Sequence, residues 1–304
     1  MSANRRKRSS GDRPTTAHPM RRVVRPGKPA WVAGSVLGPV LALALIAAAA
    51  SIGVIRSAGG GVTTAETIAR QTSAGDAESL RVNVLRRFAH DTSAYTQGLI
   101  WSEGKLYEST GQYGASTLRR VDPQTGAVEH RVAISPAFFG EGLARVGNRL
   151  IMLTWKAQRA FVFEFDSFTP TGSFNYRGEG WGLCDDGSRL IMSNGSDRLT
   201  FRDRETFEPV GDVAVTLRGL PLPQINELEC VDGAVYANVY QQEFLVRIDP
   251  ATGRVTQYID AAGLLTLEER RGTDVLNGIA YDPDAETFYL TGKLWPAMFE
   301  VTFE

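Results

Sequence analysis

Cysteine and histidine are scarce in this chain of 304 residues, which contains two cysteines and three histidines. Neither Cys184 nor Cys230 has a Cys-x-x-Cys spacing, and His18, His90 and His130 are far apart, so the sequence indicates no zinc site. It also has no evident Gly-x-Ser-x-Gly elbow or glycine-rich phosphate loop. These absences argue against the common zinc-enzyme, serine-hydrolase and nucleotide-binding classes, and we expect no metal and no cofactor.

The two cysteines have no obvious partner in the sequence. An extracytoplasmic compartment would permit a disulfide, but nothing in the sequence shows that Cys184 and Cys230 approach each other. We expect both to be buried small apolar residues.

Charge is missing altogether from residues 31 to 55, which are mostly Val, Leu, Ile and Ala. As a helix, this segment would be about 37 Å long, enough to cross the ~30 Å hydrocarbon core of a membrane. The basic residues before it predict a cytoplasmic N-terminus. We therefore expect a basic cytoplasmic tail (1–30), a transmembrane signal anchor (31–55), a linker (56–79) and an extracytoplasmic catalytic domain (80–304). Cleavage near residues 47–50, which would release a secreted domain, is the alternative.

The net charge of −1 hides an asymmetry between the tail and the rest of the chain. Nine Lys and Arg and one Asp precede Trp31, which leaves 24 basic and 33 acidic residues and a formal charge of −9 for the remainder. An acidic domain argues against nucleic acid as a partner.

After Val82 the pattern predicts β-strands throughout, and one sequence unit recurs. The units begin with short motifs at Thr96-Gln97-Gly98-Leu99, Gly140-Glu141-Gly142-Leu143, Gly180-Trp181-Gly182-Leu183, Ile225-Asn226-Glu227-Leu228 and Leu276-Asn277-Gly278-Ile279. Their spacings of 44, 40, 45 and 51 residues suit four short strands with their turns. The last unit has room for only three strands, and the run Val82–Phe88 is a spare strand that could complete it. The sequence therefore predicts an all-β fold, a five-bladed β-propeller, preceded by the anchor helix.

Equivalent positions of the units should form rings around the propeller axis. One ring contains Gln97, Glu141, Trp181, Asn226 and Asn277, and a second, about fourteen residues later in each unit, supplies Trp155, Lys156, Tyr240 and Lys293. Polar groups gathered in this way must be satisfied by one another, by water or by a ligand. A lone Glu beside Trp faces has reason to have a raised pKa, as a carboxylic acid that gives and takes protons near neutral pH requires.

Nine motifs follow one another between Phe88 and the C-terminus. In order they are His90-Asp91 with Tyr95-Thr96-Gln97-Gly98-Leu99, Glu108-Ser109-Thr110-Gly111-Gln112-Tyr113-Gly114, Gly140-Glu141-Gly142-Leu143, Leu153-Thr154-Trp155-Lys156, Gly180-Trp181-Gly182-Leu183, Asn226-Glu227-Leu228-Glu229, Ala237-Asn238-Val239-Tyr240, Asp274-Val275-Leu276-Asn277-Gly278-Ile279 and Thr291-Gly292-Lys293-Leu294-Trp295-Pro296. With these motifs the chain resembles the glutamine cyclotransferases of the plant and bacterial type, which are five-bladed propellers.

The resemblance implies glutaminyl-peptide cyclotransferase activity, in which an N-terminal glutamine of a peptide or protein closes to pyroglutamate and releases ammonia without zinc. It implies Glu141 as the general acid and base, and Gln97, Asn226 and Lys293 as groups that hold the amide and stabilise the oxyanion. Trp155, Trp181 and Tyr240 would form the pocket walls, with Asn277 as a further substrate-binding residue. Tyr240 departs from the family, which often has Trp at this position. We expect a monomer, joined to the membrane through its N-terminal helix.

Two other functions are compatible with parts of the pattern. A calcium-dependent lactonase or esterase-like propeller would use Glu and Asn side chains such as Glu141, Asn226 and Asn277 around its metal, although such proteins usually have six blades and more channel carboxylates. A non-catalytic, membrane-anchored binding propeller is the second alternative. A single carboxylate in an aromatic pocket argues against it, because a protein-binding face needs none.

Overall fold

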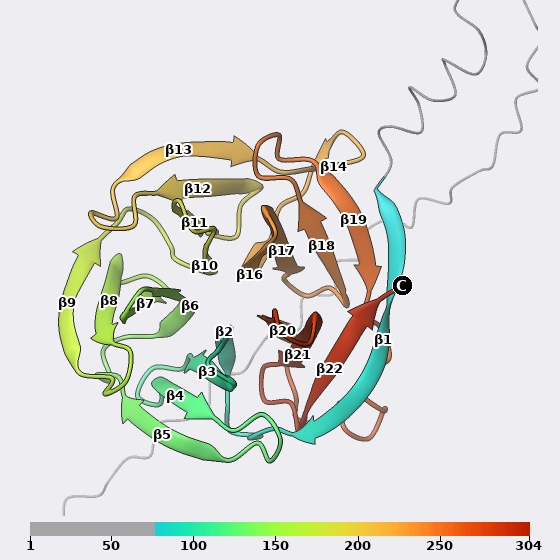
Figure 1. Ribbon diagram of the computed structural model, residues 1–304, viewed down its shortest axis with the longest axis horizontal. Coiled ribbons are helices and arrows are strands. Elements are labelled where there is room, and N and C mark those ends of the chain that lie inside the picture. The colour runs from blue at the N-terminus through green and yellow to red at the C-terminus, as the bar shows by residue number, and fades with distance from the viewer. Residues whose placement is uncertain (1–76) are drawn as a thin grey trace, which may run out of the picture. The chain divides into compact units, whose positions relative to one another are not determined.

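The computed structural model describes residues 77–304, and the regular elements in this range are strands (Figure 1). The predicted tail and anchor, and nearly all of the predicted linker, lie outside the described residues. No helix within residues 77–304 is long and apolar enough to span a membrane. The prediction of an all-β, propeller-like fold is confirmed for this part of the chain.

Five groups of four antiparallel strands, here called blades, stand around a ring (Figure 1). Blade 1 contains β2 (Thr96–Ser102), β3 (Lys105–Thr110), β4 (Thr117–Val121) and β5 (Val128–Ala133). Blade 2 contains β6 (Gly140–Val146), β7 (Arg149–Thr154), β8 (Arg159–Glu164) and β9 (Pro170–Asn175). Blade 3 contains β10 (Leu183–Asp185), β11 (Leu190–Met192), β12 (Arg198–Arg202) and β13 (Pro209–Ala214).

The remaining strands build blades 4 and 5 and a small hairpin. Blade 4 contains β16 (Ile225–Val231), β17 (Ala234–Val239), β18 (Phe244–Ile248) and β19 (Val255–Asp260). Blade 5 contains β20 (Leu276–Asp282), β21 (Thr287–Gly292), β22 (Ala297–Phe303) and β1 (Glu78–Ala89). The hairpin between blades 3 and 4 consists of β14 (Thr216–Leu217) and β15 (Leu220–Pro221).

Strand β1 closes the ring by completing the last blade. Its residues from Val82 to Ala89 pair antiparallel with β22, from Phe303 back to Ala297, so the predicted pairing of the spare strand is confirmed. Its first residues, Glu78–Arg81, pair in parallel with β19 of blade 4. The closing strand therefore joins the two neighbouring blades into one sheet and covers edges that would otherwise be exposed.

The hydrophobic core consists of five clusters, each between neighbouring blades. The last residue of each four-residue repeat motif supplies one fully buried side chain to each cluster: Leu99, Leu143, Leu183, Leu228 and Ile279. The repeated apolar residue thus packs the start of every innermost strand against the preceding blade of the ring. This packing fixes the ring from which the functional side chains extend.

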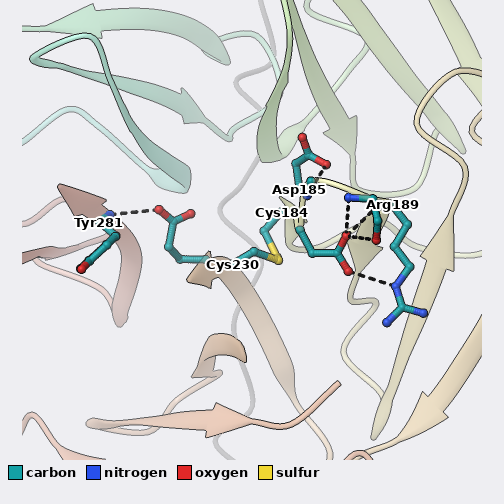
Figure 2. The surroundings of a disulfide bond; sticks show 9 residues. Cys184, Asp185, Arg189, Cys230 and Tyr281 are labelled. Atoms are coloured by element: carbon teal, nitrogen blue, oxygen red, sulfur yellow. Dashed lines mark hydrogen bonds and ion pairs between the residues drawn. A yellow bond between two sulfur atoms is a disulfide. The ribbon is translucent and has the colours of Figure 1, made fainter. Parts of the chain in front are cut away.

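The expectation that the cysteines are simply buried apolar residues is wrong. Cys184 on β10 and Cys230 on β16 form a disulfide, with an S–S distance of 1.99 Å and a Cα–Cα distance of 5.5 Å (Figure 2). The two residues lie one position apart in the aligned repeat units, and only the packing of blade 3 beside blade 4 brings their side chains together. The bond therefore ties two neighbouring innermost strands.

Candidate active site

A cavity of about 220 Å³ lies where the innermost strands begin. Its lining is aromatic and polar and consists of Tyr95, Gln97, Phe139, Glu141, Trp155, Trp181, Asn226, Tyr240 and Lys293. Seven of the eight predicted site residues are among them. The eighth, Asn277, is fully buried behind the lining and reaches the cavity only through its neighbours.

One backbone hydrogen bond recurs around the mouth and positions the second ring. The N–H of Trp155 donates to the carbonyl of Phe139 (3.0 Å), that of Tyr240 to Gln224 (2.8 Å), and that of Lys293 to Val275 (2.9 Å). In each unit the accepting residue lies two positions before the first ring. The repeat therefore places Trp155, Tyr240 and Lys293 at equivalent points of three blades.

Glycines next to this ring leave room for the aromatic walls. A Cβ on Gly195, whose φ is +79°, would lie 2.6 Å from the Trp181 indole, and a Cβ on Gly111 would lie 2.1 Å from the Phe139 ring. Both contacts are too short for any side chain. The aromatic walls can therefore pack directly on the backbone that follows the second strand of blades 1 and 3.

Glu141 is the buried carboxyl group of the cavity, with 4% of its surface exposed. Burial raises its pKa well above the usual value, although Lys293 and a hydrogen bond from Gln97 act in the opposite direction. Burial thus favours the protonated form of this carboxyl, while Lys293 and Gln97 favour its charged form. A group that takes and gives a proton needs both forms to be accessible.

The side-chain amides form a chain beside this carboxyl. Asn226 Nδ2 donates to Asn277 Oδ1 (2.8 Å), and Asn277 Nδ2 donates to the Thr96 carbonyl (2.9 Å), with Gln97 Oε1 at 3.5 Å. Asn277 uses both ends of its amide on protein groups, so it orients Asn226 and Gln97. Each of these two retains an N–H to offer to the cavity.

Lys293 brings a buried cation into the same cavity. Its ammonium lies 5.0 Å from the Tyr95 ring centre and 5.2 Å from that of Tyr240, and 4% of the residue is exposed. Burial lowers the pKa of Lys293, while the negative charges of Glu141 and Asp274 oppose that change. Lys156, by contrast, is exposed and lies 3.8 Å from the Trp155 ring centre, outside the cavity lining.

Glu179 holds the two tryptophan walls together. Its Oε2 accepts the indole N–H of Trp155 (2.7 Å) and that of Trp181 (3.0 Å). Trp181 also meets Tyr240 edge to face at 5.6 Å. One partly exposed carboxylate therefore sets the orientation of both indoles.

The ring alignment missed Tyr95, Phe139 and Glu179, although the signal was present. All three lie two residues before the first-ring position, ahead of Gln97, Glu141 and Trp181 respectively. Extending the aligned unit by two residues would have identified them. Asp274, which accepts the Tyr95 hydroxyl at 2.9 Å, has no equivalent in that alignment.

Residues that could ligate a metal are not grouped in this part of the molecule. Within residues 77–304 no three His, Cys, Asp or Glu side chains are arranged to hold a metal ion. The charged groups that act on the carboxyl of Glu141 are the Lys293 ammonium, which also lines the cavity, and the Glu179 carboxylate.

Comparison with known proteins identifies the family of the chain. The chain is 36% identical over 225 residues to a glutaminyl-peptide cyclotransferase of Arabidopsis thaliana, covering 72% of this chain and 70% of that protein. It is 38% identical to the glutaminyl cyclase of Myxococcus xanthus, whose crystal structure matches 75% of this chain and 99% of its own with a TM-score of 0.69. The family model for glutamine cyclotransferase matches residues 58–303. The chain therefore belongs to the glutamine cyclotransferase family.

Proposed function

We propose that the protein is a glutaminyl-peptide cyclotransferase in which Glu141 carries the proton that the reaction must move. The observation that carries this proposal is a single buried carboxyl in an aromatic cavity, with amide and ammonium donors around it. The cavity of about 220 Å³ suits the side chain of one N-terminal glutamine. The substrate class is peptides and proteins that begin with glutamine.

The aromatic walls would bend the glutamine so that its α-amine faces its own side-chain carbonyl carbon. Trp155, Trp181 and Tyr240 exclude water and limit the conformations of the bound side chain. Holding the two reacting atoms in contact supplies much of the rate of such an intramolecular reaction.

When the α-amine nitrogen attacks the amide carbon, a C–N bond forms and the carbonyl oxygen becomes an oxyanion. The remaining N–H groups of Gln97 and Asn226 and the Lys293 ammonium are the donors that would stabilise it. The attacking nitrogen then carries a surplus proton, and the departing NH₂ needs one. Glu141 would take the first and deliver the second, so that the C–N bond to the leaving group breaks and ammonia departs.

This chemistry needs no metal ion. The Lys293 ammonium provides the positive charge beside the oxyanion, and a cation beside Glu141 would repel a bound Ca²⁺. This arrangement favours the cyclotransferase over the calcium-dependent lactonase alternative. The binding-propeller alternative has no specific contact in its favour.

We also propose that residues 31–55 anchor the protein in a membrane, with the catalytic domain outside the cytoplasm. The uncharged segment and the basic tail before it support this orientation. The Cys184–Cys230 disulfide supports an oxidising compartment. Protease added to intact cells should degrade an anchored catalytic domain, and a cleaved domain should appear in the medium. A catalytic domain that stays in the cytosol, fully protected from the protease, would contradict the placement.

Ammonia release from a glutaminyl tripeptide by the full-length protein in detergent tests the proposed activity. We expect release in the presence of EDTA, at a rate that added Ca²⁺ does not change. A folded protein that releases no ammonia, or releases it only with Ca²⁺, would contradict the proposal.

A further inference from the structure

The longest spacing of the repeat, 51 residues between the last two units, has a structural counterpart. The loop of residues 261–275 between β19 and β20 lines a second cavity of about 430 Å³, together with the turn of residues 241–243 in blade 4 and Trp295 in blade 5. All these segments lie at the end of the ring where the innermost strands begin. The second cavity therefore opens on the same side as the active site.

The two cavities share walls. Tyr95 lines the active site and donates its hydroxyl to Asp274 Oδ2 (2.9 Å), and Asp274 lines the second cavity. Tyr240 lines the active site, and the next residue, Gln241, lines the second cavity. The Tyr95–Asp274 pair, which joins blades 1 and 5, and the Tyr240–Gln241 pair of blade 4 thus separate the cavities.

The charged side chains of the second cavity are Asp274, Glu243 and Arg270, with a net charge of −1. Arg270 forms an ion pair with Glu243. Asp274 is exposed and accepts the Tyr95 hydroxyl and the Val275 N–H (2.8 Å), and the Lys293 ammonium of the neighbouring cavity is a nearby opposite charge. The free acceptor sites of an exposed carboxylate attract a cation or an N–H donor and repel another carboxylate.

We propose that this second cavity binds the residues that follow the N-terminal glutamine of the substrate, and that it favours basic over acidic side chains there. The inference rests on the proposed function, because it assumes glutamine in the neighbouring cavity. Cyclisation uses only the first residue, so the rest of the bound peptide must extend out of the active-site cavity. Consecutive Cα atoms are 3.8 Å apart, so the second and third residues of the peptide can reach the second cavity, which shares a wall with the active site.

Steady-state kinetics with three amidated tripeptides, Gln-Lys-Lys, Gln-Ala-Ala and Gln-Glu-Glu, test the inference on the full-length protein at low ionic strength. We expect kcat/KM to be highest for Gln-Lys-Lys and roughly tenfold lower for Gln-Glu-Glu, a difference that high salt should reduce. Asp274→Asn and Glu243→Gln should each lower the Lys-to-Glu ratio, whereas Arg270→Gln should raise it. Asp284→Asn, an exposed residue in the turn between β20 and β21, makes the same charge change at the far end of blade 5 and should leave the ratio unchanged.

Equal kcat/KM values for the three peptides in the wild type would overturn the inference. So would a preference that persists unchanged in Asp274→Asn and Glu243→Gln, with thermal melting showing both variants folded. Glu243 does not contact Tyr95, so its variant keeps the test valid if Asp274→Asn fails to fold. No ammonia from any of the peptides would instead contradict the proposed function itself, and the inference with it.

Discussion

Three carboxyl groups on the innermost strands, Glu141, Glu227 and Glu229, differ in what they face. Glu227 stands where four other units have glycine, and it accepts the N–H groups of Leu99 (3.2 Å) and Ile279 (2.9 Å). Glu229 accepts the Tyr281 N–H at 3.0 Å (Figure 2). The carboxylates of Glu227 and Glu229 therefore accept hydrogen bonds from the backbone of neighbouring strands, whereas the Glu141 carboxyl faces the cavity. Burial raises the pKa of all three, so the surroundings and not the pKa distinguish the catalytic candidate.

Glu229 should make the protein less stable as the pH rises. Burial raises the pKa of Glu229 from 4.5 to about 8, so between these values the folded state binds more protons than the unfolded state. The unfolding free energy contributed by this group therefore falls with increasing pH, by up to about 1.4 kcal/mol per pH unit. Urea unfolding of wild type and Glu229→Gln at pH 5 and pH 8 should show the variant gaining relative stability at pH 8. Parallel pH dependences would contradict this assignment.

Glu179 should act on substrate binding through the two indoles that it holds. Glu179→Ala removes the acceptor of both the Trp155 and Trp181 N–H groups, and each lost charge-assisted hydrogen bond is typically worth about 1.5 kcal/mol. We expect KM for a glutaminyl peptide to rise roughly tenfold with a smaller change in kcat, and Glu179→Gln to restore part of the loss. A loss confined to kcat would contradict a positioning role.

At the scale of the strands, the start of each innermost strand supplies side chains both to the hydrophobic core and to the active site. Leu228 and Asn226 lie two residues apart on β16, one packed between blades and the other in the cavity. The same strand is tied to β10 through Cys230. The placement of Asn226 therefore depends on how firmly blades 3 and 4 are joined.

Removing the disulfide should lower the stability of the protein measurably. The bond closes a loop between residues 46 apart in sequence, and such cross-links typically contribute about 2–4 kcal/mol. We expect Cys184→Ala/Cys230→Ala to lose stability within that range in urea unfolding. A reducing agent should destabilise the wild type but leave the variant unchanged, and no difference between the two proteins would contradict the role of the bond.

At the scale of the whole molecule, strand β1 closes the ring. Deleting residues 1–81 removes the parallel pairs with β19 and leaves the pairs with β22, so the protein should fold with a lower melting temperature. Deleting residues 1–89 removes the closing strand entirely and exposes both edges, so cooperative melting should be lost. Circular dichroism melts of the two truncations decide this, and a cooperative transition in the shorter protein would contradict closure by β1.

The sequence predicted the propeller-like fold and most of the cavity because each blade repeats one motif, and a repeat places equivalent residues in a ring. What it did not predict depends on contacts between different blades. The Cys184–Cys230 bond joins positions that are not equivalent in the repeat units. Asn277 occupies an equivalent position, but its side-chain amide forms hydrogen bonds with Asn226 and the Thr96 carbonyl instead of facing the cavity. Asp274 lies outside the aligned motifs and reaches the site only through Tyr95.

The most direct test of the account compares kcat/KM for a glutaminyl peptide in wild type, Glu141→Gln and Glu229→Gln. Each variant removes one carboxyl of an innermost strand: that of Glu141 faces the cavity, and that of Glu229 accepts the Tyr281 N–H. Loss of general acid and base catalysis typically costs about 10²- to 10⁴-fold, so we expect a loss of that size in folded Glu141→Gln and near wild-type activity in Glu229→Gln. Activity retained in Glu141→Gln would contradict its role as the group that carries the proton.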